Sequence, residues 1–279
     1  MVMGKIGLIT DFGTRAGYVA SLKGVILSIH SDCTIVDLSH DISPQNIVEA
    51  ALFLDNCTLY FPEGFIFLTV VDPGVGTSRK MLCMETKQKR QVFIAPDNGV
   101  LSLVAQSQGV AKLVTLENKK YWRETTSWTF HGRDIMAPVA AHVAAGTPIE
   151  KIGPTIDPGQ MIKLSLPRES YVHDDGTIAG YILYADQFGN VITNVLEEEL
   201  SKAGITLNDT LGITLVSGKK VLKAISAPFK KFYAEVKAGE FLCLLNSENR
   251  FEIAINCGSA MSNLGNTGQG QEILVKKRG

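Results

Sequence analysis

Short apolar runs, each followed at once by a polar segment, alternate with helical patterns in the first half of the chain. Residues 6–10 and 34–38 predict strands, residues 18–29 and 44–54 predict helices, and residues 65–71 predict a fully buried strand. This alternation is typical of βαβ units, which build a mostly parallel sheet with right-handed crossovers. Ligands of such sheets lie beyond the carboxyl ends of the strands, so polar residues there are the first candidates for a functional site.

The character of the sequence changes at about Pro167. Upstream, residues 81–86 and 91–95 predict a strand pair, and residues 132–145 predict an Ala-rich helix closed by Gly146. Downstream, only residues 196–203 predict a helix. The other downstream segments are short, β-branched and bounded by turns: 176–184, 190–194, 211–216, 241–246 and 251–255.

These patterns predict an α/β protein with two domains. The length of 279 residues favours two cores over one. Prolines and a lack of periodicity place the boundary between residues 153 and 168. We predict an N-terminal Rossmann-like α/β domain at residues 1–160 and a C-terminal antiparallel β-barrel-like domain at residues 168–279.

The composition excludes several classes of protein. The formal net charge of −1 supplies no field that would gather nucleic acid. The longest apolar runs have the length of strands, far short of the ~20 residues of a membrane helix. The N-terminus lacks the pattern of a secretory signal, so we expect a cytoplasmic protein. The 5 cysteines are odd in number and widely spaced, which favours reduced thiols over disulfides or metal ligands.

Asp11 follows the first predicted strand, within the segment Thr10–Gly13. A carboxylate at the end of a parallel strand can accept hydrogen bonds from both hydroxyls of a ribose, as acidic residues do in dinucleotide-binding folds. The structural alternative is an aspartate that only caps a turn or the next helix. We expect the ribose-binding role for Asp11.

Asp72 and Arg79 stand on one Gly-rich loop directly after the buried run of residues 65–71. Such loops let the backbone approach a ligand closely, although this one lacks the Gly-Lys-Ser/Thr of a phosphate loop. A purely structural ion pair is the alternative. His131 precedes the helix predicted at 132–145, where a histidine can exchange a proton near neutral pH and the positive helix end favours an anion.

Metal and kinase chemistry are not indicated. The histidines show no HxH or HExxH spacing. Residues 11–13 spell the DFG of kinases, but the Gly-rich loop, strand lysine and HRD loop of kinases are missing. Residues 74–76 are too short for a dinucleotide fingerprint. In the second half, the turns at 186–190 and 246–249 offer carboxylates and amides, and each taken alone reads as an ordinary hairpin turn.

Taken together, these segments resemble the S-adenosyl-methionine hydroxide adenosyltransferases, a family related to the fluorinases and chlorinases. The resemblance spans nearly the whole chain, and its motifs occur in the family's order, which makes it specific. The motifs are TDFG at 10–13, DLSHDISP at 37–44, VVDPGVG at 70–76, APDNG at 95–99, TFHGRDIMAP at 129–138 and DQFGNVITN at 186–194.

The resemblance implies a homotrimer whose sites lie between the first domain of one subunit and the second domain of its neighbour. The family's hydrolysing members share an Asp-Arg-His set, which falls on Asp72, Arg79 and His131. The ribose-binding aspartate of the family falls on Asp11. The substrate would be S-adenosyl-methionine, with no metal and no other cofactor.

The resemblance also locates the two ends of the substrate. The methionine end would be held around Asp186 and Asn190, with Phe188 packing nearby. Adenine would lie near Ser247 and the backbone of residues 256–258.

Two positions differ from the halogenating relatives. Where those relatives carry Tyr in a TYP segment, this chain has Val71-Asp72-Pro73. A fixed negative charge there repels a halide but can orient and deprotonate a water, and Arg79 would keep that carboxylate ionised. Gln45 stands where relatives often carry an aromatic residue, so the contact with the sugar face differs.

The expected reaction is hydrolysis of S-adenosyl-methionine to adenosine and methionine by attack at the ribose 5′ carbon. The sulfonium leaves as a neutral thioether, so the leaving group needs no help. The difficulty lies in the nucleophile, because neutral water is weak. A positioned base and correct alignment of the water overcome this. A halogenase on the same scaffold is one alternative. A non-enzymatic protein that binds adenosine or S-adenosyl-methionine is the other.

Overall fold

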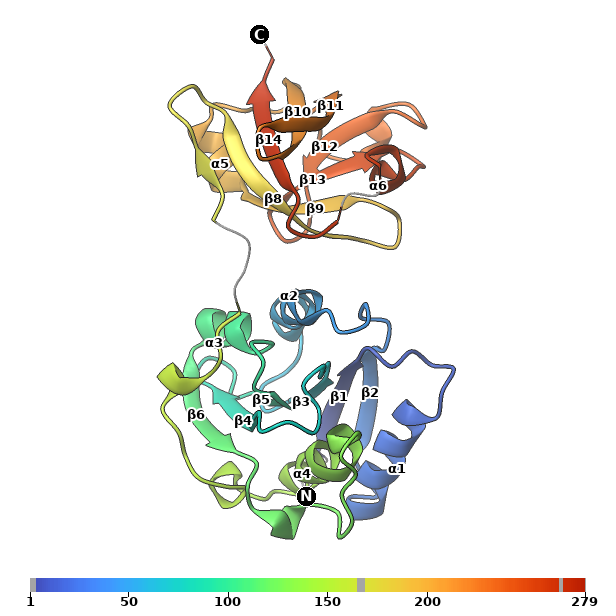
Figure 1. Ribbon diagram of the computed structural model, residues 1–279, viewed down its shortest axis with the longest axis vertical. Helices are drawn as coiled ribbons and strands as arrows, with labels where there is room; N and C mark the ends of the chain where they lie inside the picture. Colours follow the sequence, from blue (N-terminus) through green and yellow to red (C-terminus); the bar gives the residue numbers. More distant parts are fainter. Residues whose placement is uncertain (1–3, 165–168, 266–267, 279) are drawn as a thin grey trace. The chain divides into compact units, whose positions relative to one another are not determined.

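The structure is a computed structural model that describes residues 4–164, 169–265 and 268–278. The chain divides into two compact units, Met1–Ser165 and Leu166–Gly279 (Figure 1). Residue 168, where the second domain is predicted to begin, lies outside the described residues.

The helices and strands of the first unit are β1 (Lys5–Thr10), α1 (Tyr18–Ile29), β2 (Thr34–Ser39), α2 (Ile47–Thr58), β3 (Ile66–Val70), β4 (Met81–Thr86), β5 (Val92–Pro96), α3 (Ser102–Gln108), β6 (Val110–Thr115) and α4 (Ala137–Ala144). Those of the second unit are β7 (Tyr171–Val172), β8 (Ile178–Ala185), β9 (Val191–Leu196), α5 (Glu197–Lys202), β10 (Thr210–Ser217), β11 (Lys220–Pro228), β12 (Phe241–Leu245), β13 (Arg250–Ile255), α6 (Ala260–Asn263) and β14 (Glu272–Lys277).

The first unit is a sheet covered on both faces by helices. Its strand order is β2-β1-β3-β5-β4-β6, and β2, β1, β3 and β5 run parallel. Helices α1 and α4 cover one face, and α2 and α3 cover the other (Figure 1). With both faces covered, every residue of β3 is buried, as the apolar run predicted.

The register of the parallel strands brings the predicted site segments together. Thr10 pairs with Val70 of β3, and Ser39 pairs with Ile9 of β1. The chain therefore leaves the sheet at neighbouring points just before Asp11 and just before Asp72. This is the edge at which ligands of open α/β sheets bind.

Helix α2 begins later than residue 44, where the apolar pattern predicts its start. Gln45 adopts a left-handed backbone with φ of 65°, which a continuing α-helix does not allow. The side chain of Asn46 then caps the helix by accepting a hydrogen bond of 3.1 Å from the amide of Glu49. The segment before α2 is thereby free to line the strand ends.

The helix predicted at 132–145 is in two parts. A π-helical turn spans Gly132–Met136, and α4 follows it with Pro138 in its first turn. Turns of this kind interrupt helices frequently at functional sites. His131 stands at the start of this turn.

The second unit is an antiparallel, barrel-like sheet, which confirms the predicted fold class. Its strands run in the order β11-β10-β14-β8-β9-β13-β12, and β7 adds to β8. A bridge between Phe229, just after β11, and Cys243 of β12 joins the two ends of the sheet, so the barrel is nearly closed. Apolar side chains from the strands fill its interior.

All of the cysteines are free. Cys33, Cys83 and Cys243 are buried, and Cys257 is exposed. Burial raises the pKa of the Cys57 thiol to about 12, so that thiol stays protonated. In the described ranges, the helices are too short or too polar to cross a membrane.

Candidate active site

A hollow of about 390 Å³ opens at the carboxyl ends of β1 and β3 in the first unit. It brings together Asp11, Asp72 and His131, which the sequence analysis singled out from three distant segments. The complete lining is Asp11, Phe12, Tyr18, Pro44, Gln45, Val70, Asp72, Pro73, Val75, Thr129, Phe130, His131 and Gly132.

Asp72 and Arg79 form a nearly buried, two-point ion pair beside this hollow. Arg79 Nε donates to Asp72 Oδ1 at 2.6 Å, and Arg79 Nη2 donates to Asp72 Oδ2. The side chains are only 5% and 8% exposed for Asp72 and Arg79. Each carboxylate oxygen keeps a lone pair after this pairing, so Asp72 is oriented without being fully occupied.

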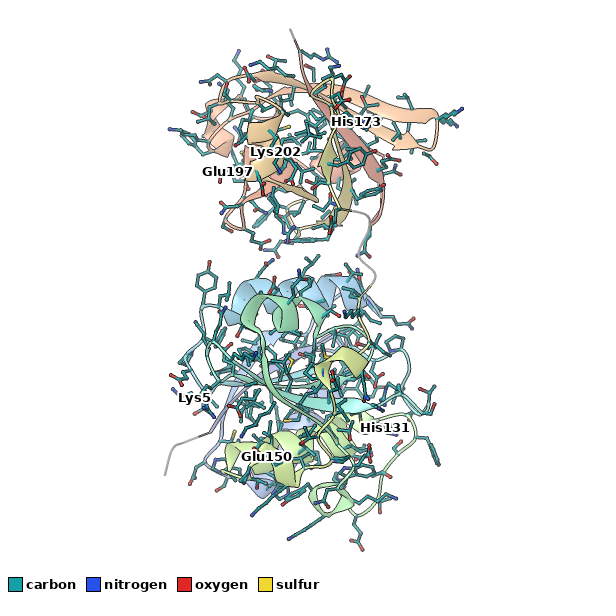
Figure 2. The ribbon with its side chains drawn as sticks, turned by 90° about the vertical axis from the view of Figure 1, so that its left-hand side faces the viewer. Lys5, His131, Glu150, His173, Glu197 and Lys202 are labelled. Atoms are coloured by element: carbon teal, nitrogen blue, oxygen red, sulfur yellow. The ribbon has the colours of Figure 1, made fainter. Side chains whose placement is uncertain are left out.

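His131 completes the cluster, and its position fixes its protonation. Arg79 Nη2 lies 3.3 Å from His131 Nδ1. Because a guanidinium can only donate, Nδ1 accepts, and the neutral ring carries its proton on Nε2. Burial, followed by the charge of Arg79, lowers the pKa of His131, although Asp72 and Asp134 oppose the shift. His131 is therefore neutral at neutral pH. Figure 2 labels it among the side chains of the first unit.

Arg79 also presents a donor that nothing fills. Its Nη1 is buried and has no hydrogen-bond partner in the part of the chain that the structure describes. A buried N–H group without a partner is costly, so such groups usually bind water or a ligand. The cluster therefore offers an anchored carboxylate, a neutral histidine and a vacant cationic donor.

Close backbone contacts position the loops that carry this cluster. A Cβ on Gly132 would lie 2.8 Å from Val70 Cγ1, so the turn beside His131 can pack on the end of β3 only with glycine there. A Cβ on Gly76, whose φ is 82°, would lie 2.6 Å from the carbonyl oxygen of Trp128. Asn98 Nδ2 donates at 2.9 Å to the carbonyl of Val71, directly before Asp72.

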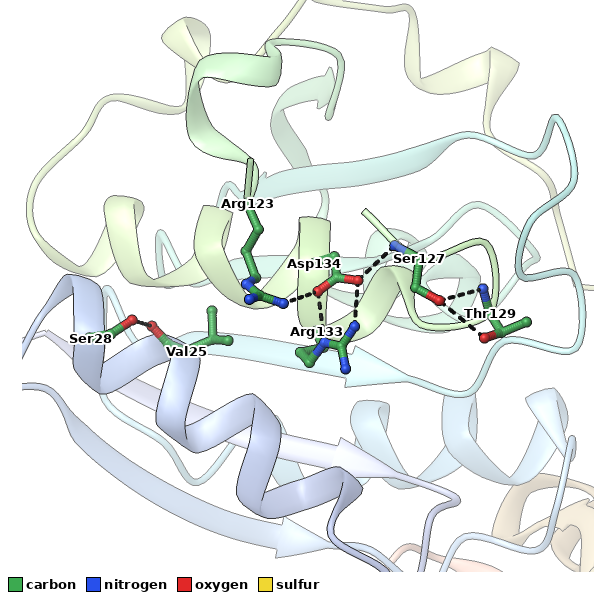
Figure 3. A network of polar contacts seen from close by, with 7 residues as sticks. All are labelled: Val25, Ser28, Arg123, Ser127, Thr129, Arg133 and Asp134. Atoms are coloured by element: carbon green, nitrogen blue, oxygen red, sulfur yellow. Dashed lines mark hydrogen bonds and ion pairs between the residues drawn. The ribbon is translucent and has the colours of Figure 1, made fainter. Parts of the chain in front are cut away.

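Asp134 ties down the segment that leads to His131, a role the sequence analysis did not assign. Figure 3 shows Arg123, Arg133 and the amide of Ser127 converging on its carboxylate, at 2.7–2.8 Å. Burial alone would raise the pKa of Asp134, but these hydrogen bonds lower it to about 2. Asp134 is thus an ionised, fully buried anchor for residues 123–134.

Asp11 faces the same hollow from the end of β1. Its Oδ2 accepts a hydrogen bond of 2.8 Å from the amide of Gln45, and its Oδ1 has no partner among the described residues. The rings of Phe12, Tyr18 and Phe130 pack against one another with centroids 5.5–5.6 Å apart, forming an aromatic wall. The sequence analysis did not single out Tyr18 or Phe130, because an aromatic residue beside an apolar pattern reads as core.

The second unit has a hollow of its own, of about 600 Å³, around Asp186. Asp186 Oδ1 accepts from the amides of Phe188 and Asn190, and Oδ2 accepts from Asn190 Nδ2, each at 2.9 Å. Phe188 is 68% exposed at the rim. The lining is Asp186, Phe188, Asn190, Tyr233, Ile255, Asn256, Cys257 and Gly258.

Two further polar residues stand near this hollow, and one predicted residue stands outside its lining. The Tyr233 hydroxyl donates at 2.8 Å to Glu252, which is buried on β13. Burial raises the pKa of Glu252, and the charge of Asp186 adds to the shift. Ser247 lies exposed in the turn between β12 and β13 and does not line the hollow. The described ranges hold no group of three or more His, Cys, Asp or Glu side chains arranged to bind a metal ion.

Comparison with known families matches both units. Residues 6–153 match the SAM hydroxide adenosyltransferase N-terminal domain, and residues 180–273 match the C-terminal domain of the same family. The crystal structure of an uncharacterized conserved protein from Thermotoga maritima aligns with a TM-score of 0.88 and 37% identity, covering 98% of this chain and 100% of that one.

Proteins with assigned activities are similar over most of the chain. The (R)-S-adenosyl-L-methionine hydrolase of Methanocaldococcus jannaschii is 35% identical over 253 residues, 89% of this chain and 87% of the relative. The enzyme of that name from Thermus thermophilus is 32% identical over 94% of this chain and 96% of the relative. A fluorinase from Actinoplanes is 31% identical over 75% of this chain and 78% of the relative. This chain belongs to the SAM hydroxide adenosyltransferase family.

Proposed function

We propose that this protein hydrolyses S-adenosyl-methionine to adenosine and methionine without a metal or other cofactor. The observation that carries the proposal is the Asp72–Arg79–His131 cluster, because it sets an oriented carboxylate and a histidine, both bound to Arg79, beside the hollow that Asp11 faces. Relatives named as hydrolases of this substrate, similar over about nine-tenths of the chain, support it.

In this proposal Asp72 and Arg79 hold the attacking water. Arg79 Nη1 donates to the water oxygen, and a free lone pair of Asp72 accepts one of its protons. As the water oxygen bonds to the ribose 5′ carbon, the C–S bond breaks and its electron pair goes to sulfur. The proton that the water loses passes to Asp72. The products are adenosine, with the water oxygen in its 5′ hydroxyl, and methionine.

Both carboxylate oxygens of Asp72 are held by Arg79, so in this proposal alignment of the water carries much of the catalysis. The leaving thioether is neutral and needs no proton, and the positive sulfur makes the 5′ carbon a strong electrophile. A base that assists only as the new bond forms contributes ~10²–10⁴-fold, and in-line positioning adds to it. His131 accepts from Arg79 and thereby holds the guanidinium in the plane that serves both Asp72 and the water.

Asp11 would bind the ribose hydroxyls through its free Oδ1, and the second unit would bind the rest of the substrate. Asp186, Asn190 and Phe188 would hold the methionine end, with the backbone of residues 256–258 near adenine. Ser247 would contact adenine from outside the lining of this hollow. We further propose a homotrimer in which the hollow of one subunit's first unit and the hollow of a neighbour's second unit form one site.

Halide transfer is the second candidate, because fluorinases are also similar to this chain at 31% identity or less. The side chain of Asp72 argues against it, since a carboxylate can take a proton from an attacking water, whereas a halide carries no proton and needs no base. A protein that only binds adenosine is the non-enzymatic alternative. Binding of adenosine without any release of methionine would favour it.

One experiment separates these functions. The purified protein is incubated with S-adenosyl-methionine in water enriched in heavy oxygen, with and without chloride or fluoride. The proposal requires methionine and adenosine labelled in the 5′ hydroxyl. A 5′-halo-adenosine, or unlabelled adenosine, would refute it.

A further inference from the structure

A chain of hydrogen bonds runs behind Asp11, from helix α1 to the end of β1. Lys23 Nζ donates to Asp37 Oδ2 at 2.6 Å, and Asp37 Oδ1 lies 3.0 Å from His40 Nε2. His40 Nδ1 then lies 2.9 Å from the hydroxyl of Thr10, the residue before Asp11. None of these four residues lines the hollow, so none contacts a ligand bound there.

The direction of the hydrogen bonds to Asp37 follows from its partners. Burial would raise the pKa of Asp37, but the hydrogen bonds from Lys23 and His40 lower it, so this carboxylate only accepts. His40 must therefore carry a proton on Nε2. The Thr10 hydroxyl has one hydrogen and two lone pairs, so it accepts from the amide of Phe12 at 3.3 Å and also bonds Nδ1 of His40. The ring of His40 thus links Asp37 to Thr10.

His40 holds the turn after β1 at two points. Its side chain binds Thr10, and its carbonyl accepts from the amide of Gly13 at 2.7 Å. The parallel register explains this, because Ser39 pairs with Ile9 and the chain leaves both strands side by side. His40 is only 5% exposed and Thr10 is fully buried. Asp11 sits inside the turn that these two contacts fix.

We propose that Asp37, His40 and Thr10 are positioning residues that fix the Asp11 carboxylate for the sugar hydroxyls of the substrate. This inference rests on the proposed function only in taking the ligand to be a nucleoside. The Gln45 amide orients Oδ2 of Asp11 from one side. The hydrogen-bonded chain fixes the backbone of Asp11 from the other, so that Oδ1 faces the hollow.

Thr10 offers a matched pair of variants. Thr10→Val removes the hydroxyl but keeps the β-branched shape of a buried strand residue, and Thr10→Ser keeps the hydroxyl. Calorimetry on the full chain measures the affinities for adenosine and for 2′-deoxyadenosine. Only adenosine has both ribose hydroxyls to which Asp11 can bind. Loss of one buried hydrogen bond predicts roughly tenfold weaker adenosine binding in Thr10→Val. The affinity for 2′-deoxyadenosine should change much less, and Thr10→Ser should restore discrimination.

A double-mutant cycle shows whether the effect passes through Asp11. In an Asp11→Asn background, Thr10→Val should add little, because the residue that it positions is already changed. An unchanged penalty in that background, or equal losses for both nucleosides, would overturn the inference. So would a wild-type protein that does not prefer adenosine over 2′-deoxyadenosine.

A second measurement does not depend on ligand or on the variant folding. Nitrogen NMR of the wild-type protein should show a proton on Nε2 of His40, where Asp37 accepts it. A bare Nε2 would overturn the proposed chain, because His40 would then not be bound to Asp37. If the protein binds and discriminates adenosine but releases no methionine from S-adenosyl-methionine, the proposed hydrolysis fails and this inference stands.

Discussion

In the first unit, Asp72 is paired with a guanidinium from its own loop, whereas in the second unit Asp186 is held by the amides of its own turn. An ion pair cancels most of the negative charge of Asp72, but neutral amides leave the charge of Asp186 uncompensated. The effect is visible on Glu252, whose raised pKa owes part of its shift to Asp186. This difference supports the proposed division of labour, in which the first unit orients the reacting group and the second attracts a cation such as an ammonium group.

Asp72→Asn should give the largest effect of any single change. It keeps the shape of the side chain but removes the base and the charge, so we expect turnover to fall by ~10²–10⁴-fold. Adenosine binding should change little, because Asp11 is intact. Single-turnover assays of methionine release, with calorimetry of adenosine as the control for folding, measure both. Turnover within tenfold of wild type would show that Asp72 is not the reacting carboxylate.

Mixed trimers test whether the two units of different subunits share a site. Asp72→Asn disables the first unit and Asp186→Asn weakens the second, each in an otherwise intact chain. If each site combines neighbours in a trimer, random equimolar mixing regenerates about a quarter of the sites with both carboxylates. Co-folded mixtures assayed at low substrate should therefore exceed both parent variants. Activity that equals the average of the parents would place each site within one chain.

Asp186→Asn alone should affect binding rather than chemistry. Losing the uncompensated charge should raise KM for S-adenosyl-methionine by roughly tenfold, a typical effect for one charged contact, while kcat stays near the wild-type value. Asp174→Asn, at an exposed turn of the same unit, is the matched control and should change neither constant. A fall in kcat with unchanged KM would assign Asp186 to the chemical step. The second unit would then not be limited to binding the substrate.

The sequence predicts the elements whose apolar pattern is set by burial, on both faces for β3 and on one face for α1. Strand β3 and helix α1 lie where their apolar patterns place them, and Asp11 and Asp72 follow strand ends as expected. Strand β11 was not predicted, because most of its side chains are exposed and its composition shows no clear alternation. Strand β14 and helix α3 were missed as well.

Parts of the site were beyond sequence reasoning for a physical reason. Asn98 and Asp134 lie within two of the motifs, but their roles come from contacts that only the folded chain shows, and Tyr233 contacts Glu252 from outside every motif. The left-handed φ of Gln45 accompanies its contact with Asp11 and is not favoured by its residue type. His131 was singled out by its place before a helix, but its tautomer required the position of Arg79.

The smallest expected effect is the response of the first unit to pH through His131. Burial and Arg79 lower the pKa of His131 below its ordinary value of 6.5, and protonation would turn Nδ1 from an acceptor into a donor facing the guanidinium. We therefore expect kcat/KM to stay level as the pH falls to 6.5 and to drop only below it. His131→Asn, whose amide oxygen can accept from Arg79 but does not titrate, should lack this acidic drop.

The lowered pKa of His131 also makes the stability of the folded protein depend on pH. In the unfolded chain this histidine takes up a proton near pH 6.5, whereas in the folded protein it stays neutral to a lower pH. Lowering the pH from 6.5 toward the lowered pKa therefore favours unfolding. Melting temperatures of the wild type should thus fall more steeply over that window than those of His131→Asn. Parallel melting curves would mean that folding does not shift the pKa of His131, and a kcat/KM that rises on acidification would mean that the charged histidine is the working form. Nη2 of Arg79 would then face a second cation, and the charges of the first unit would no longer balance.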